Sequence, residues 1–213
     1  MATIVVYSVD MLRVYDVNSP GLRDRILDAA ERILRAEGIS ALTTRRLAGA
    51  VGVTAMAMYR HFRDKDALVT ALIASGFERW EARLAEAVRT PDARERIANA
   101  LQAYRDFALV EPRYFELMFL VPRPGRPLAP ESLRATPSPS FAAVLASVHE
   151  CTANGEFVPG DPGQIILMMW SLVHGMMALH FTGRFGFDDV LFRRRYDEVT
   201  SLLLARLSLT TPS

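Results

Sequence analysis

The sequence predicts an all-α protein, because apolar residues recur at helical spacing through most of the chain and several segments open with a capping residue followed by proline. Past the first residues, no segment sustains the alternation of apolar and polar side chains that is typical of a half-buried strand. We place the domain boundaries so that residues 1–18 form an N-terminal extension, 19–66 a small three-helix domain and 67–213 a larger helical domain.

Local signals mark where the helices begin and end. Four pairs place an oxygen-bearing side chain before a proline at a first helical position: Ser19-Pro20, Thr90-Pro91, Ser138-Pro139 and Asp161-Pro162. Gly38 is predicted to end the first helix. The helices expected after the small domain cover 64–89, 91–110, a short segment after Pro112, 139–152, 162–182 and 188–207, with a proline-rich connection over 121–140.

The composition is that of a folded protein, and nothing in it argues for an oxidising compartment. The chain has 213 residues, half of them hydrophobic, and its formal net charge is only +1. Cys151 is the sole cysteine, so no intramolecular disulfide can form, and we expect it to be a small buried residue. Residues 1–18 lack the basic start and cleavage site of a signal peptide, and we find no apolar run bounded like a membrane span. We therefore expect a cytoplasmic protein with no membrane partner.

The stretch TTRRLAGAVGVTAMAMYRHF has the spacing of a helix-turn-helix. Thr43 is placed to cap a first short helix, Gly52 supplies the tight turn, and Thr54 caps a second helix, AMAMYRHF. In such a motif the second helix enters the major groove of DNA, where the small side chains around Met56 permit close approach and contact with thymine methyl groups. From its start to Lys65 this region carries four arginines and one lysine against one aspartate, which suits binding to phosphates.

Residues 20–68, and LTTRRLAGAVGVTAMAMYRHFRDKDAL in particular, resemble the DNA-binding domain of the TetR family of transcriptional repressors. The resemblance implies contacts with double-stranded operator DNA from Thr44, Arg45, Thr54, Ala55, Met56, Ala57, Tyr59, His61 and Lys65. Within this set, residues 54–57 would face bases, while Tyr59, His61 and Lys65 would bind phosphates. The sequence departs from the family pattern at Ala55 and Met56, where many members carry a long polar residue and a glycine or proline.

The C-terminal part carries a second resemblance. EPRYFELMF and WSLVHG are similar to a subclass of TetR-family C-terminal domains with a Trp-His-Gly signature. In this family the C-terminal helices form a dimer interface and usually a small-molecule pocket, so the resemblance implies a homodimer and an effector. The effector itself does not follow from the resemblance.

Hydrophobicity independently favours a dimer. The segment 165–181 is apolar nearly all round, so it must be covered on both sides, by the monomer core and by a second subunit. One face holds Trp170, Val173, His174, Met177, Ala178 and Phe181, and another holds Ile165, Met169, Leu172, Met176 and Leu179. Gly175 would let a partner backbone approach closely, and the last helix offers a stripe made of Phe192, Tyr196, Val199, Leu202 and Leu203. The alternative is a fully buried central helix in a monomer.

An effector site is expected among the helices after Pro91, where aromatic rings, adaptable methionines and histidine are combined as in apolar ligand sites. The candidate lining residues are Tyr104, Phe107, Met118, Phe119, Phe141, Leu145, Trp170, His174 and Met177. This composition leads us to expect a small apolar or aromatic effector, with His174 positioned to orient it by one hydrogen bond. No Asp or Glu falls on these faces, so a strongly cationic effector is not expected.

Motifs of catalysis and of cofactor or metal binding are missing from the sequence, which has no GxSxG, no HExxH, no phosphate-binding glycine loop and no Cys/His metal spacing. We therefore predict no catalytic residue, no cofactor and no metal. The predicted function is a sequence-specific DNA-binding transcriptional regulator, a repressor released by its effector. One alternative is an effector-independent architectural DNA-binding protein. This alternative is disfavoured, because residues 91–207 are far more than dimerisation alone needs. Another, a helical enzyme, would need clustered titratable groups in the C-terminal part.

Overall fold

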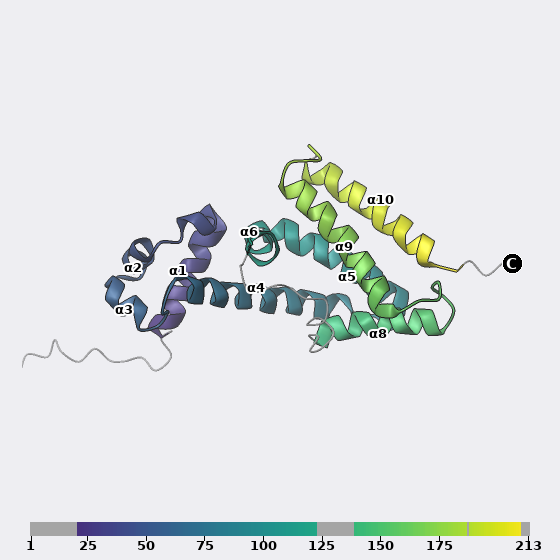
Figure 1. The fold of residues 1–213 in the computed structure, drawn as a ribbon, viewed down its shortest axis with the longest axis horizontal. Coiled ribbons are helices and arrows are strands. Elements are labelled where there is room, and N and C mark those ends of the chain that lie inside the picture. The colour runs from purple at the N-terminus through teal and green to yellow at the C-terminus, as the bar shows by residue number, and fades with distance from the viewer. Residues whose placement is uncertain (1–20, 123–138, 187, 210–213) are drawn as a thin grey trace, which may run out of the picture.

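The computed structural model describes residues 21–122, 139–186 and 188–209, and these are helical almost throughout (Figure 1). Within these ranges, the β pairing is a single isolated antiparallel bridge between Phe157 and Ser208. The all-α prediction is therefore confirmed. The predicted extension over 1–18 and most of the proline-rich connection lie outside the described residues.

The small domain is built from short helices around a shared core. Its elements are α1 (Leu22–Glu37), the 3₁₀ turn η2 (Ile39–Ala41), α2 (Thr44–Val51) and α3 (Ala55–Tyr59). Gly38 ends α1, as predicted: its φ is 82° and its N–H donates to the carbonyl of Leu34. The α3 helix is shorter than predicted, because the N–H groups of His61 and Phe62 both bond to the Met58 carbonyl and turn Phe62 into the core.

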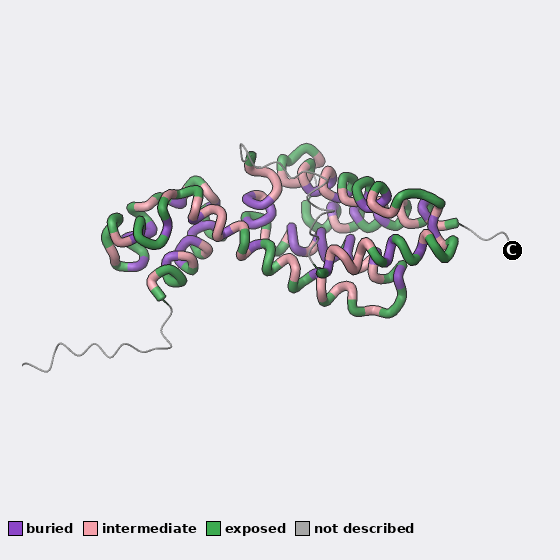
Figure 2. The backbone as a smooth tube through the Cα atoms, turned by 60° about the horizontal axis from the view of Figure 1, so that its bottom comes forward, coloured by how far each residue is buried: buried purple, intermediate pink, exposed green. Residues whose placement is uncertain are grey.

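The larger domain begins with the long helix α4, which leaves the small domain and runs below α6 and α5 toward α8 (Figure 1). Its elements are α4 (Lys65–Ala87), α5 (Ala93–Val110), α6 (Pro112–Phe115), the π-helical turn η3 (Glu116–Leu120), α8 (Pro139–Ala153), α9 (Pro162–Phe181) and α10 (Asp189–Leu207). Helix α5 packs against α4, α8, α9 and α10 and is therefore the centre of this domain. Figure 2 shows the buried backbone positions concentrated along the inner sides of these helices.

The capping signals were only partly correct. Asp161 caps α9, since its carboxylate accepts a hydrogen bond from the Gly163 N–H at 3.2 Å. Thr90 does not cap α5: the helix begins two residues later than predicted, and the Asp92 carboxylate accepts from the Glu95 N–H at 2.7 Å. A carboxylate close to the first turn is favoured there by the helix dipole as well. Ser19 and Ser138 lie outside the described residues.

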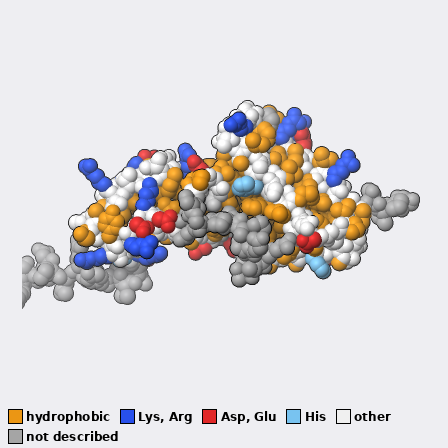
Figure 3. Space-filling view, in the orientation of Figure 1, with side chains coloured by type: hydrophobic (Ala, Val, Ile, Leu, Met, Phe, Trp, Pro, Cys, Tyr) orange, Lys and Arg blue, Asp and Glu red, His pale blue; other side chains and the backbone are white. Residues whose placement is uncertain are grey.

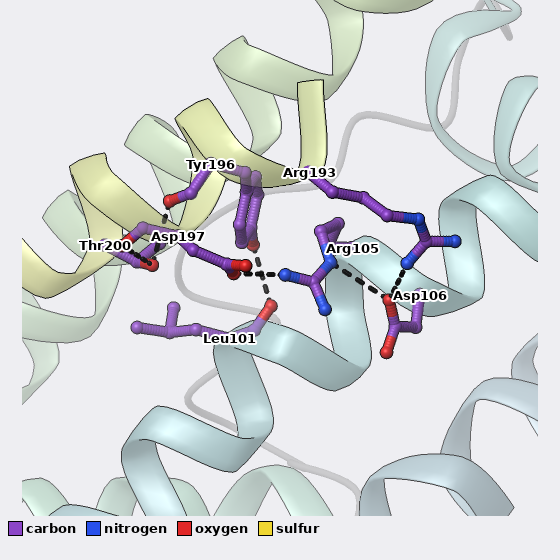
Figure 4. A network of polar contacts seen from close by, with 7 residues as sticks. All are labelled: Leu101, Arg105, Asp106, Arg193, Tyr196, Asp197 and Thr200. Atoms are coloured by element: carbon purple, nitrogen blue, oxygen red, sulfur yellow. Dashed lines mark hydrogen bonds and ion pairs between the residues drawn. The ribbon is translucent and has the colours of Figure 1, made fainter. Parts of the chain in front are cut away.

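A polar network fixes α10 on α5 (Figure 4). Arg105 is only 8% exposed and forms ion pairs with Asp106 and Asp197, while Arg193 binds Asp106 at 2.6 Å. Burial opposes the charge on Asp106, but the two arginines outweigh it and lower its pKa. The Tyr196 hydroxyl donates to the Leu101 carbonyl at 2.7 Å. Because a buried charge is tolerated only when paired, this network sets the relative position of the two helices.

Helix α9 is long and apolar enough to cross a membrane by length and composition alone. The core helix of a soluble protein meets the same criterion, and α9 packs against α5, α8 and α10. Cys151, by contrast, is fully buried as predicted.

Candidate DNA-binding surface and ligand cavity

The end of the molecule formed by α2 and α3 has the geometry of a helix-turn-helix. The side chain of Thr43 accepts from the Arg46 N–H, and that of Thr54 accepts from the Ala57 N–H, so both helices are capped as predicted. Gly52 adopts the left-handed conformation (φ 71°, ψ 37°) that links them, and this conformation favours glycine. The Arg25 guanidinium donates to the Val51 carbonyl at 2.8 Å and so ties the end of α2 to α1.

The predicted base-facing residues lie on the outer side of this motif. Met56 is 71% exposed, Ala55 is exposed beside it, and Ala57 is half-buried. Thr54 is exposed, although its hydroxyl is already used in the cap. Short side chains around one flexible methionine leave the backbone of α3 accessible to a groove.

The predicted phosphate-binding residues surround α3. Tyr59 is 51% exposed, and His61 and Lys65 are exposed as well. Thr44, Tyr59 and Lys65 line the same small surface depression, so three residues far apart in the motif come together. Figure 3 shows Lys and Arg side chains around this end of the molecule.

The basic residues here differ in whether they are already paired. Arg46 forms an exposed ion pair with Glu37, which lowers the pKa of that carboxyl through a hydrogen bond and charge. In the part of the chain that the structure describes, Arg45, Arg60 and Lys65 make no ion pair. These three cations are therefore available to an anionic partner.

A cavity of about 690 Å³ lies in the larger domain, between α4, α5, α8 and the first half of α9, with the η3 turn at one side. This is the size range of sites for drug-sized ligands. Its lining residues are mostly apolar, and six of them are aromatic rings: Phe77, Trp80, Tyr104, Phe119, Phe141 and Trp170. The remainder of the wall consists of Ala142, Leu145, Ala146, His149, Asp161, Pro162, Gly163, Ile166 and Leu167.

The cavity brings together some of the predicted lining residues and omits others. Tyr104, Phe119, Phe141, Leu145 and Trp170 lie on its wall. Phe107, Met118, His174 and Met177 do not line it; Phe107 and Met177 are fully buried in the core, and Met118 packs against α4. Phe77 and Trp80 of α4 also line the cavity and are additions to the predicted set.

Two polar residues on the wall lie outside the predicted lining set. Asp161 and His149 line the cavity and are both exposed to solvent, so they lie at its opening. The predicted faces carry no acidic residue, but Asp161 lies at the opening of the cavity outside those faces. Asp161 reaches this position because the residue that caps α9 stands where α9 approaches α8.

Tyr104 is the polar group of the inner wall. Its hydroxyl lies 2.7 Å from Nδ1 of His174, and both rings are surrounded by aromatic side chains, including Phe115 and Phe119. Burial raises the pKa of Tyr104 and lowers that of His174, so both side chains are neutral near pH 7. His174 thus contacts Tyr104 instead of the cavity.

The cavity wall is connected to the small domain through α6. Tyr114 is fully buried, and the guanidinium carbons of Arg35 and Arg79 lie 5.7 Å and 5.5 Å from its ring centroid. Arg35 also binds Glu111 at 2.6 Å, and Arg79 binds Glu31 at 2.5 Å. Arg35 and Glu31 belong to α1, so these contacts join the DNA-facing domain to the segment that carries Phe119.

Helices α9 and α10 leave an apolar stripe uncovered. Its α9 members are Met168, Leu172 and Leu179, and its α10 members are Val190, Leu191 and Leu202. Figure 3 shows hydrophobic side chains gathered over these two helices. The predicted faces are corrected here: Ile165, Met169, Met176, Phe192 and Tyr196 are buried in the monomer core. A Cβ on Gly175 would have nothing within 4 Å, so this part of α9 is open.

Comparison with known proteins identifies both parts of the chain. Residues 26–72 match the family described as "Bacterial regulatory proteins, tetR family", and residues 97–206 match "Tetracyclin repressor-like, C-terminal domain". An HTH-type transcriptional repressor of Mycobacterium tuberculosis is 40% identical over 72 residues, which are 34% of this chain and 38% of that protein. A class A tetracycline repressor protein of Escherichia coli is 33% identical over 113 residues, which are 50% of this chain and 47% of that protein. The matches thus span less than half the length of these two relatives.

Solved structures resemble the chain over most of its length. A protein of unknown function from a Rhodococcus species has 28% sequence identity and a TM-score of 0.72, covering 92% of this chain and 100% of that chain. The TetR family transcriptional regulator PfmR from Thermus thermophilus has a TM-score of 0.62 at 20% identity, covering 90% of this chain and 100% of that chain. The second likeness supports the fold alone.

Proposed function

Because the chain belongs to the tetR family of bacterial regulatory proteins, we propose that it is a cytoplasmic transcriptional regulator that binds operator DNA through α2 and α3 and represses until an effector binds. The observation that supports this best is that Ala55 and Met56 are exposed at the start of α3, while Arg45, Arg60 and Lys65 around them make no ion pair with any residue that the structure describes. Small side chains at the centre and cations at the edges suit a groove between two phosphate backbones.

The DNA-binding unit in this proposal is a homodimer. The exposed apolar stripe on α9 and α10 is the self-complementary surface, since monomeric proteins seldom leave such a patch in water. A symmetric pair of helix-turn-helix motifs reads half-sites about 34–36 Å apart, so the operator should be an inverted repeat.

The cavity supports release by a small effector over the alternative of an architectural DNA-binding protein. A ligand can shift an equilibrium only if it binds one state more tightly than the other. Phe119, which lines the cavity, follows Tyr114 on the segment α6–η3, and Tyr114 contacts Arg35 of α1. A ligand that moves this segment therefore acts on the orientation of the DNA-binding domain. The proposed boundaries remain 19–66 for DNA binding and 67–213 for effector binding and dimerisation; assignment to the Trp-His-Gly subclass stays a prediction.

Selection from a pool of random duplex DNA tests the proposal. Purified protein should enrich an inverted repeat, and the enriched site should bind with a strong dependence on salt because phosphates are neutralised. The triple variant with alanine at Arg45, Tyr59 and Lys65 is the matched control and should enrich nothing. A pool that stays unenriched with the native protein would contradict DNA reading.

A further inference from the structure

We propose that the cavity takes an uncharged ring-containing molecule with one carbonyl or hydroxyl oxygen, and that Tyr104 is the residue that selects this oxygen. The inference rests on the proposed function, because it treats the cavity as the effector site. It goes further by naming the chemistry of the ligand and the side chain that recognises it.

The shape and composition of the wall set the body of the ligand. Six aromatic rings line about 690 Å³, contributed by α4, α5, η3, α8 and α9, so aromatic faces and edges are offered from several sides. Rings gain from edge-to-face and offset contacts beyond the area that they bury. A rigid ring system also loses less conformational entropy on binding than a flexible chain of the same volume.

The charges around the wall exclude an ionised group at the inner end. Among the described lining residues there is no Lys or Arg, and Asp161 and His149 stand at the opening. An anionic ligand group beside Tyr104 would be buried without a counter-charge, which is costly. The Tyr104 hydroxyl is itself neutral, since burial raises its pKa.

Tyr104 can still bond to a neutral oxygen. A phenol has one hydrogen and two lone pairs; the contact with Nδ1 of His174 uses one of these three, and a hydrogen bond from the Trp170 side chain uses a lone pair. In one tautomer of the neutral imidazole, Tyr104 donates to His174 and keeps one lone pair for a ligand hydroxyl. In the other tautomer, His174 donates to Tyr104, whose hydrogen is then free for a ligand carbonyl. The pair Tyr104–His174 can therefore adapt to either oxygen.

The protein carries its own reporter for this test. It has two tryptophans, Trp80 and Trp170, and both line the cavity, so quenching of intrinsic fluorescence measures occupancy directly. Four probes share one ring system: fluorene, fluorenone, fluorenol and fluorenecarboxylate. We expect fluorenone and fluorenol to bind about three- to tenfold more tightly than fluorene, the gain typical of one neutral hydrogen bond. The carboxylate should bind at least about tenfold more weakly than fluorenone.

The Tyr104→Phe variant removes only the hydroxyl and should bind all three neutral probes equally. If this variant does not fold, the order of the four probes on the native protein still decides. Equal binding of fluorene and fluorenone, tighter binding of the carboxylate, or no binding by any probe would overturn the inference. Probes that bind in the expected order but leave operator affinity unchanged would support it while contradicting effector-controlled release, so the two failures are distinguishable.

Discussion

Gly76 on α4 lies directly against Met118 of the η3 turn: a Cβ built on this glycine would stand 2.6 Å from Sδ of Met118 and 2.8 Å from a ring carbon of Tyr114. Two elements that border the ligand cavity thus meet without room for a methyl group. Met118 is a flexible side chain, but the Tyr114 ring is buried between two arginines and has little freedom to move.

Gly76→Ala is therefore expected to lower the free energy of unfolding by about 1–3 kcal/mol through overpacking. Gly49→Ala is the matched control, because Gly49 is also helical and a Cβ there would have nothing within 4 Å. That control should raise stability by about 0.5–1 kcal/mol, since glycine is unfavourable inside a helix. Denaturant unfolding of both variants measures the two effects, and a pair of equal shifts would refute the packing argument.

Lys65→Ala should weaken binding to every DNA sequence alike and reduce the salt slope by about one, as loss of one phosphate contact does. Arg89→Ala removes the same charge from the far end of the α4 region and should leave both quantities unchanged.

Met56→Gln should instead change the preference at one base position by roughly 1–3 kcal/mol. Fluorescence anisotropy over a salt series distinguishes these results. If Met56→Gln weakened binding to all DNA sequences equally, Met56 would not be a base-contacting residue of α3.

Gly175→Glu and Leu202→Arg should separate the dimer, because each places a charge in the apolar stripe. Val110→Glu is the control, because Val110 is as exposed as Leu202 (58% against 57%) but lies at the end of α5, outside the stripe. Sedimentation at micromolar concentration should show monomers for the first two variants and dimers for the control. A native protein that sediments as a monomer would contradict the proposed interface, and monomeric variants should lose operator binding.

The neutral state of His174 predicts a pH dependence of stability. Its pKa in the folded protein is lowered by burial from an ordinary value of 6.5, so below that value the unfolded chain takes up a proton that the folded chain does not. The stabilisation is fully present above the ordinary value and is lost progressively as pH falls from there through the lowered pKa of the folded state. His174→Asn keeps an acceptor near Tyr104 and cannot titrate. Between pH 7.5 and 5 the native protein should lose more unfolding free energy than this variant; parallel losses would exclude His174 as the cause.

Cys151 should be inert toward thiol reagents in the native state. Burial raises the pKa of its thiol to about 11, with the carboxylate of Glu156 adding to the effect, so almost no thiolate is present at pH 8. Labelling by a disulfide reagent should therefore follow unfolding and rise in step with denaturant. Rapid labelling of the native protein would show that the α8 region opens locally.

Signals of short range were read correctly from the sequence. The caps at Thr43 and Thr54 and the end of α1 at Gly38 each depend on a few adjacent residues, and the structure has all three. The π-helical turn after α6 has no comparable local signal, because the packing of Met118 on Gly76 involves another helix.

The cavity could be predicted only in part for a related reason. Helical spacing shows which side of α4 turns inward, the side that carries Phe77 and Trp80. It does not show whether neighbouring helices leave a space beside those rings, so spacing alone could not assign either ring to a cavity wall. Asp161 was missed because its position at the opening depends on how α9 approaches α8.

The contacts of Tyr114 with Arg35 and Arg79 bear on how such a regulator could be rebuilt by domain exchange. A chimera joined at the start of α4 would keep the reading motif of its donor but would lose Glu31 and Arg35, which come from α1. Its Arg79 and Glu111 would then face an interface without their ion-pair partners. A working hybrid must therefore carry these two α1 residues into the foreign domain. The ligand response of such a hybrid then depends on whether both side chains have been introduced.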